Sequence, residues 1–165
     1  MSNFSIAAMG PGEAALAYAL IRTLGPEVSP EHWQAFVTAH AERGGGILVL
    51  RGRMGGVFGL ASYRIEDCKR SGRLLLVENF LTIEFSASAP GRKLLSAALV
   101  RIAADLGCEE VRQMVGCLPG MPAPARGLRN HLMLIDAEGH TFNRGPDCSC
   151  GSLAVLSAAE MYPAM

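Results

Sequence analysis

The residues best suited to chemistry form a short segment from Glu84 to Lys93. Its central residues, Ser86–Gly91, are all small, and two adjacent cations, Arg92 and Lys93, close it. An apolar run precedes the segment and the most regular helical pattern of the chain follows, so the segment predicts a loop that enters a helix. Free N–H groups at a helix N-terminus favour an anion, above all phosphate. The segment therefore predicts an anion site, whose ordinary alternative is a tight turn with two solvated cations.

Two carboxylates beside this loop, Glu78 and Glu84, are candidates for proton transfer. Glu78 interrupts an otherwise apolar run. Burial raises the pKa of a carboxyl group, so we expect the pKa of Glu78 to rise toward the range of a general base. The ordinary alternatives are a strand-edge or ion-paired role for Glu78 and a loop position for Glu84.

Composition and motif spacing exclude several common functions. Fifteen Lys and Arg balance fifteen Asp and Glu, which gives none of the basic excess of a nucleic-acid binder. No apolar run approaches the ~20 residues that span a bilayer. The phosphate-loop, dinucleotide-binding and nucleophile-elbow motifs are all absent from the sequence.

The five cysteines are odd in number and follow no export signal, which predicts reduced thiols and a cytoplasmic location. Cys148 and Cys150 lack the paired clusters of a structural zinc site, so we predict no metal. We expect His32 and His40 to lie on a surface helix and to have ordinary roles. Only 18% of the residues are charged, which suggests an interface buried against a second copy of the chain.

Hydrophobic periodicity divides the chain into helices and strands. Two amphipathic helices follow the first strand, with apolar stripes of Leu16, Leu20 and Leu24 and of Trp33, Phe36, Val37 and Ala41. We expect a polar loop at Glu66–Arg73. The predicted elements are a strand at Asn3–Ala8, helices at Gly12–Leu24 and from Pro30, strands at Ile47–Arg51, Val57–Ile65 and Leu74–Glu84, a helix at Gly91–Leu106, a strand at Cys108–Val115, a helix at Ala125–Leu132, strands at Met133–Ile135 and His140–Arg144, and a strand or short helix within Leu153–Met161.

This order predicts one mixed α/β domain over residues 1–165. Its elements run β-α-α-β-β-β-α-β and continue α-β-β. An antiparallel meander leads into a single right-handed βαβ crossover, so the central sheet is mixed and flanked by helices. Leu74–Glu84 is almost continuously apolar, which is typical of a central strand covered on both faces.

The segment Leu74–Val115 and the element order resemble the GNAT superfamily of N-acetyltransferases. In that family a strand leads into a Q/R-x-x-G-x-G/A loop and then a helix with a Leu-Leu pair. Here Ser86–Gly91 falls on the loop, and Leu94 and Leu95 fall on the pair. Ser86 stands where the family has Gln or Arg, and Ala89 stands where it has the middle glycine; Gly91 matches.

The resemblance implies a GNAT-like fold that uses acetyl-CoA and a primary amine acceptor. The amine would attack the thioester directly in a ternary complex, with Glu78 or Glu84 taking its proton. The backbone of Leu81, Thr82 and Ile83 would bind the pantetheine arm and polarise the thioester carbonyl. The pyrophosphate would lie on the loop and first helical turn: Ser86, Ala87, Ser88, Ala89, Pro90, Gly91, Arg92 and Lys93.

Two other functions remain open at this point. The family often places a Tyr after the fifth strand to protonate the leaving thiolate, but no Tyr lies between Tyr63 and Tyr162. Together with the altered loop, this favours a GNAT-like module that binds acyl-CoA or a protein partner without catalysis. A metal-binding regulator that uses Cys148 and Cys150 is the third alternative.

Overall fold

The computed structural model describes residues 4–10, 12–24, 28–69, 72–83, 88–115 and 152–156. Its elements are β1 (Phe4–Ala8), α1 (Ala14–Leu24), α2 (Pro30–Glu42), β2 (Gly46–Gly52), β3 (Val57–Cys68), β4 (Gly72–Thr82), α3 (Pro90–Asp105), β5 (Glu110–Val115) and β6 (Ser152–Leu156). From β1 to β5 they follow the predicted order. The helix predicted at Ala125–Leu132 and the strands predicted at Met133–Ile135 and His140–Arg144 lie outside the described residues.

One mixed sheet holds the described strands in the order β1-β2-β3-β4-β5-β6. Neighbouring strands are antiparallel, except that β4 and β5 are parallel and are connected through α3. The prediction of an antiparallel meander followed by one parallel crossover is therefore confirmed. Leu153–Met161 is predicted to contain a strand or a short helix, and residues 152–156 form a strand.

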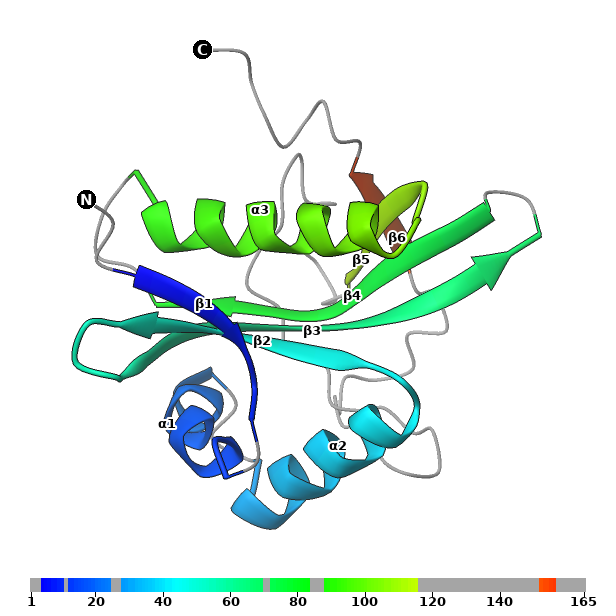
Figure 1. Cartoon of the computed structure of the whole chain (residues 1–165). Helices are drawn as coiled ribbons and strands as arrows, with labels where there is room; N and C mark the ends of the chain where they lie inside the picture. The colour runs from blue at the N-terminus through cyan, green and yellow to red at the C-terminus, as the bar shows by residue number, and fades with distance from the viewer. Residues whose placement is uncertain are drawn as a thin grey trace.

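The helices cover both faces of the sheet (Figure 1): α3 lies on one face, and α1 and α2 lie on the other. Each face has its own apolar cluster. Under α1 and α2 the cluster is built around Trp33, Phe36 and Leu60, and under α3 it is built around Phe80, Leu95 and Leu99. β4 contributes to both clusters, which is why its sequence is apolar at nearly every position.

Helix α2 begins as its sequence predicts. Ser29 caps it by accepting a hydrogen bond from the backbone N–H of His32 (3.2 Å), and Pro30 occupies the first helical turn. The Trp33 indole donates to the carbonyl of Ala14 (2.7 Å), which ties α2 to α1.

In both α1 and α2, one residue of the predicted apolar stripe is exposed. Leu16 of α1 is 62% exposed, because Ala14, Ala17 and Ile21 form the buried face instead. In α2 Ala41 is exposed and His40 is buried. The prediction that His40 belongs to the surface of the helix is therefore wrong.

The polar loop predicted at Glu66–Arg73 is also wrong. Strand β3 continues to Cys68 and β4 begins at Gly72, so most of this segment is paired strand. Arg64 forms an ion pair with Glu66 along β3, and Arg73 lies 4.0 Å from Asp67 across the hairpin. Charges on the outer face of a two-stranded ribbon are compatible with strand structure, and here cross-strand pairing outweighs their low strand propensity.

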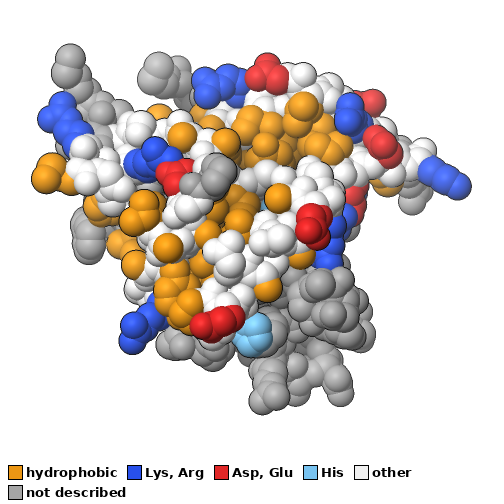
Figure 2. All heavy atoms as spheres, turned by 60° about the horizontal axis from the view of Figure 1, so that its bottom comes forward, with side chains coloured by type: hydrophobic (Ala, Val, Ile, Leu, Met, Phe, Trp, Pro, Cys, Tyr) orange, Lys and Arg blue, Asp and Glu red, His pale blue; other side chains and the backbone are white. Residues whose placement is uncertain are grey.

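Figure 2 shows the face on which α1 and α2 lie. Apolar side chains gather there, and the Lys and Arg side chains among the coloured residues are scattered rather than joined in a stripe. No helix in the part of the chain that the structure describes is both long and apolar enough to cross a bilayer.

Candidate functional site

The two parallel strands β4 and β5 separate near the middle of the sheet. Their paired positions run from Leu74 opposite Glu110 to Val77 opposite Gln113, and pairing ends there. Both strands continue, β4 to Thr82 and β5 to Val115. After Val77, therefore, β5 no longer pairs with this edge of β4.

A β-bulge coincides with this divergence. Ser62 of β3 lies opposite Asn79, whereas the next residue, Tyr63, lies opposite Val77. Glu78 is the extra residue of β4 at this point. A bulge bends the strand that carries it and redirects its side chains, and bulges are common beside functional sites.

Backbone direction after the bulge follows from one hydrogen bond. The N–H of Ile83 donates to the carbonyl of Phe58 in β3 (2.7 Å). Successive residues of a strand direct their backbone groups to opposite sides. The backbone groups of Thr82 and Phe80 therefore point toward the edge of β4 from which β5 has separated. Of the three residues predicted to bind the pantetheine arm, Ile83 therefore has its N–H directed at β3, and Thr82 presents its backbone to the opening.

The N-terminus of α3 follows directly after this end of β4. Ala89 is the N-cap residue and adopts the left-handed conformation (φ 45°, ψ 55°), Pro90 occupies the first turn and Gly91 is buried. Ala89 has no side chain that could cap the first turn. The N–H groups at a helix N-terminus favour an anion.

The two cations of this turn have different surroundings. The Arg92 guanidinium reaches back to β4, where it donates to Thr82 Oγ1 (3.3 Å) and lies over the Phe80 ring (5.9 Å to its centre). Lys93 is exposed. Lys93 is therefore the cation of the turn that lies toward solvent, while Arg92 links the helix start to the end of the central strand.

We predict that Ala89→Gly stabilises the protein. The left-handed conformation strains any residue that has a Cβ, and glycine adopts it without strain. The gain is partly offset by the greater freedom of glycine in the unfolded chain, which leaves about 0.5–1 kcal/mol in urea unfolding. Ala104→Gly, at an exposed position inside α3, is the matched control and should cost about 1 kcal/mol. Equal losses in both variants would contradict the strain at Ala89.

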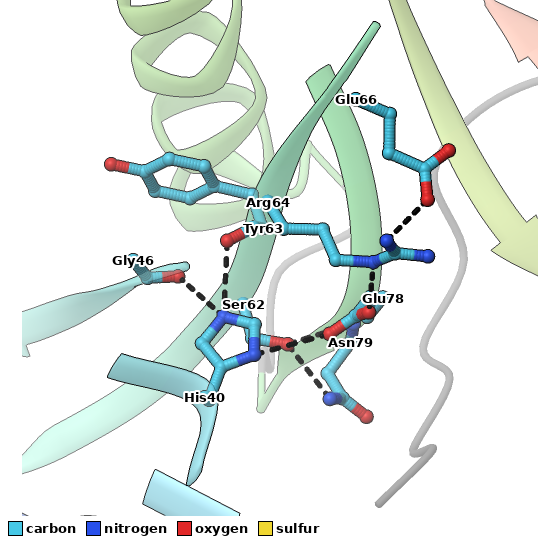
Figure 3. A network of polar contacts seen from close by, with 8 residues as sticks. All are labelled: His40, Gly46, Ser62, Tyr63, Arg64, Glu66, Glu78 and Asn79. Atoms are coloured by element: carbon cyan, nitrogen blue, oxygen red, sulfur yellow. Dashed lines mark hydrogen bonds and ion pairs between the residues drawn. The ribbon is translucent and has the colours of Figure 1, made fainter. Parts of the chain in front are cut away.

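Glu78 is buried and held by two cationic side chains (Figure 3). Its Oε1 accepts from Arg64 Nε (2.6 Å), and its Oε2 lies 3.2 Å from His40 Nδ1. Burial raises the pKa of Glu78, but the hydrogen bonds and charges of His40 and Arg64 outweigh it, and the pKa lies below its ordinary value. The predicted upward shift is therefore wrong, and the alternative of an ion-paired residue is confirmed.

Several other candidates differ from expectation or lie outside the description. Glu84, Ser86 and Ala87 are outside the described residues, as are Cys148 and Cys150. Tyr63 packs against the cluster under α3, and burial raises the pKa of its phenol. Within the described ranges, no three side chains of His, Cys, Asp and Glu are grouped so as to hold a metal ion.

Comparison with known proteins identifies the fold. No protein-family model matches the sequence, and no curated protein does either. Solved structures do match. A GNAT family acetyltransferase from Staphylococcus aureus superposes with a TM-score of 0.60 at 14% identity, over 79% of this chain and 100% of its own.

Two further structures match to a similar extent. Glucosamine-6-phosphate N-acetyltransferase from Arabidopsis thaliana gives a TM-score of 0.57 at 17% identity, over 79% of this chain and 99% of its own. The aminoglycoside N-acetyltransferase AAC(6')-Iy in complex with CoA gives 0.57 at 16% identity, over 80% and 96%. This chain therefore has the fold of the GNAT acetyltransferases. The resemblance read from the loop and the element order is confirmed at the level of the fold.

Proposed function

We propose that this protein is an acetyl-CoA-dependent N-acetyltransferase that acts on a primary amine of a small molecule or peptide. The observation that carries the proposal is the divergence of β4 from β5 next to the N-terminus of α3. An extended cofactor arm can take the place of the missing strand neighbour, and its phosphates can reach the helix N-terminus. The superposition on GNAT acetyltransferases, one of them in complex with CoA, supports the same function.

We assign the described residues to successive parts of the cofactor. The backbone of Phe80 and Thr82 lines the arm, whereas that of Leu81, like that of Ile83, is directed at β3. The N–H of Thr82 donates to the thioester oxygen as negative charge develops there. Ser88–Lys93, together with Ser86 and Ala87, receives the pyrophosphate. The amine nitrogen forms a bond to the thioester carbon, the C–S bond then breaks, and the surplus proton of the nitrogen passes to the departing sulfur to give the CoA thiol. The ammonium proton must leave before attack, and Glu84 is the carboxylate that we propose to accept it.

A second candidate function is a GNAT-like module that binds acyl-CoA or a protein partner as a sensor or adaptor. One observation favours it: the cations that bind both oxygens of Glu78 make this carboxylate a weak base. For either function we propose a cytoplasmic location, and a homodimer whose interface covers apolar surface.

Thermal unfolding with acetyl-CoA, CoA or NADH tests the proposal. A ligand that binds only the folded chain raises the melting temperature, and a concentration of 100 times the dissociation constant adds about 2.7 kcal/mol. We expect a shift with both CoA species and none with NADH. Release of free CoA thiol with a panel of primary amines then separates the enzyme from the binding module. Equal shifts with NADH, or none with any of the three, would contradict the assignment of the site.

A further inference from the structure

The buried polar side chains of the described chain gather at one place. They lie on α2, β3, β4 and β5, and most surround the bulge of β4: His40, Ser62, Glu78, Asn79, Thr82 and Gln113. Buried polar groups are costly unless they are hydrogen-bonded, so their concentration in an otherwise apolar sheet requires an explanation. The role that we assign to these side chains rests on the proposed function.

Side chains replace the backbone pairing that the bulge interrupts (Figure 3). The Ser62 hydroxyl accepts from both the backbone N–H (3.2 Å) and the side-chain amide (2.8 Å) of Asn79. On the other side of the extra residue, Arg64 of β3 binds Glu78 of β4. Two links between β3 and β4 therefore enclose the bulge and hold it in one conformation.

His40 extends this network to helix α2. Its Nε2 lies 3.0 Å from the carbonyl of Tyr63 and 3.3 Å from that of Gly46, while its Nδ1 faces Glu78. Both ring nitrogens thus face acceptor oxygens, and only the imidazolium can donate from both. His40 therefore joins the carbonyls of β2 and β3 to the Glu78 carboxylate of β4.

The surroundings of the imidazole hold it in this position. The Phe36 ring stacks on it (5.2 Å between ring centres, 25° between planes). On the strand side, a Cβ at Gly45 would lie 2.3 Å from Nε2, so only glycine leaves room for the ring. Gly45 therefore has a steric role: it allows the last turn of α2 to approach the bulge.

From these contacts we propose that His40, Glu78 and Arg64 are positioning residues, which fix the β4 bulge and thereby the direction of the backbone from Phe80 to Thr82 toward the cofactor. Only one residue separates Glu78 from Phe80, so a change at the bulge rotates the following amides. Glu78 acts through this backbone and does not accept the substrate proton, since both its oxygens are bound by cations.

Three variants test this role. Glu78→Gln removes the negative charge at nearly constant shape, and Gly45→Ala displaces the imidazole without changing any charge. Glu13→Gln is the matched control: it breaks another Glu–Arg pair, with Arg51 of β2, and includes none of the residues of the bulge network. The first readout is hydrogen exchange, by mass spectrometry, of peptides that cover residues 79–83 and, for comparison, β1.

We expect exchange at residues 79–83 to be at least tenfold faster in Glu78→Gln and Gly45→Ala, with β1 unchanged, and no change at residues 79–83 in Glu13→Gln. The second readout is binding and turnover. The dissociation constant of CoA and the KM for acetyl-CoA should rise about tenfold in the same two variants, and kcat should fall as the Thr82 amide loses its direction, while the shape of the pH–rate profile is kept. Gly45→Ala keeps Glu78 and so remains informative if Glu78→Gln fails to fold.

Two results would overturn the positioning role. One is unchanged exchange at residues 79–83 in a folded Gly45→Ala variant. The other is a Glu78→Gln variant with normal CoA affinity, a large loss of kcat and a lost acidic limb in the pH–rate profile, which identifies Glu78 as the base. If the wild-type chain binds no CoA, the proposed function fails, and the exchange measurement still decides whether the network orders the end of β4.

Discussion

Replacing Glu78 by glutamine should lower the free energy of unfolding by about 3 kcal/mol at neutral pH, although the two side chains have the same shape. The amide leaves the buried His40 without its counter-charge, and the loss of one partner from a buried pair is costly. Arg64 is 34% exposed, so hydration of its guanidinium offsets most of the interaction energy that it loses with Glu78. Urea unfolding measures the difference, and the better-solvated Glu13→Gln should cost less than about 1 kcal/mol.

The pH dependence of this loss has a definite sign. The pKa of Glu78 in the folded chain is below its ordinary value of 4.5, because His40 and Arg64 outweigh the effect of burial. A lowered pKa contributes stability that is complete above the ordinary value and is lost as pH falls through the folded value. The gap between wild type and Glu78→Gln should therefore narrow as pH falls below 4.5. A gap that narrows already between about pH 5 and 7 would mean that the pKa is raised.

The element order was predictable because local signals agree with the tertiary structure. The Ser29 cap with Pro30, the glycine after each helix and the continuous apolar run in β4 each specify an element without knowledge of its neighbours. The hairpin between β3 and β4 was not predictable in this way. Its outer residues are charged, and only their pairing with one another and across the hairpin makes them a strand.

The candidate site was predictable in parts. The position of Glu78 in an apolar run correctly identified it as unusual. Its pKa, however, depends on His40 and Arg64, and no pattern in the sequence shows that these side chains contact it. A signal for His40 existed: Trp33, Phe36 and His40 follow helical spacing and share one buried face. Arg64 could not have been found, because the bulge shifts the register of β3 against β4 by one residue.

Reversing the charge of Lys93 should weaken CoA binding by roughly tenfold to a hundredfold. This estimate takes a hydrogen bond to a charged group as worth about 1.5–3 kcal/mol. Lys93 lies in the first turn of α3, is exposed, and is the cation of that turn not engaged with β4. A carboxylate there repels the pyrophosphate that we place on the same turn. Gly91 is a poorer position for this test, since it is buried and a larger side chain there would disturb packing.

Arg101→Glu is the matched control for Lys93→Glu. It makes the same change in net charge, at an exposed position of the same helix, about 12 Å farther along the axis. That separation exceeds the screening length in physiological salt, so CoA affinity should stay close to that of the wild type. Titration calorimetry at two salt concentrations measures both variants, and the Lys93 effect should shrink as salt rises. Equal weakening in the two variants would show that CoA responds to the charge of the whole chain, and the phosphate site at the start of α3 would then be wrong.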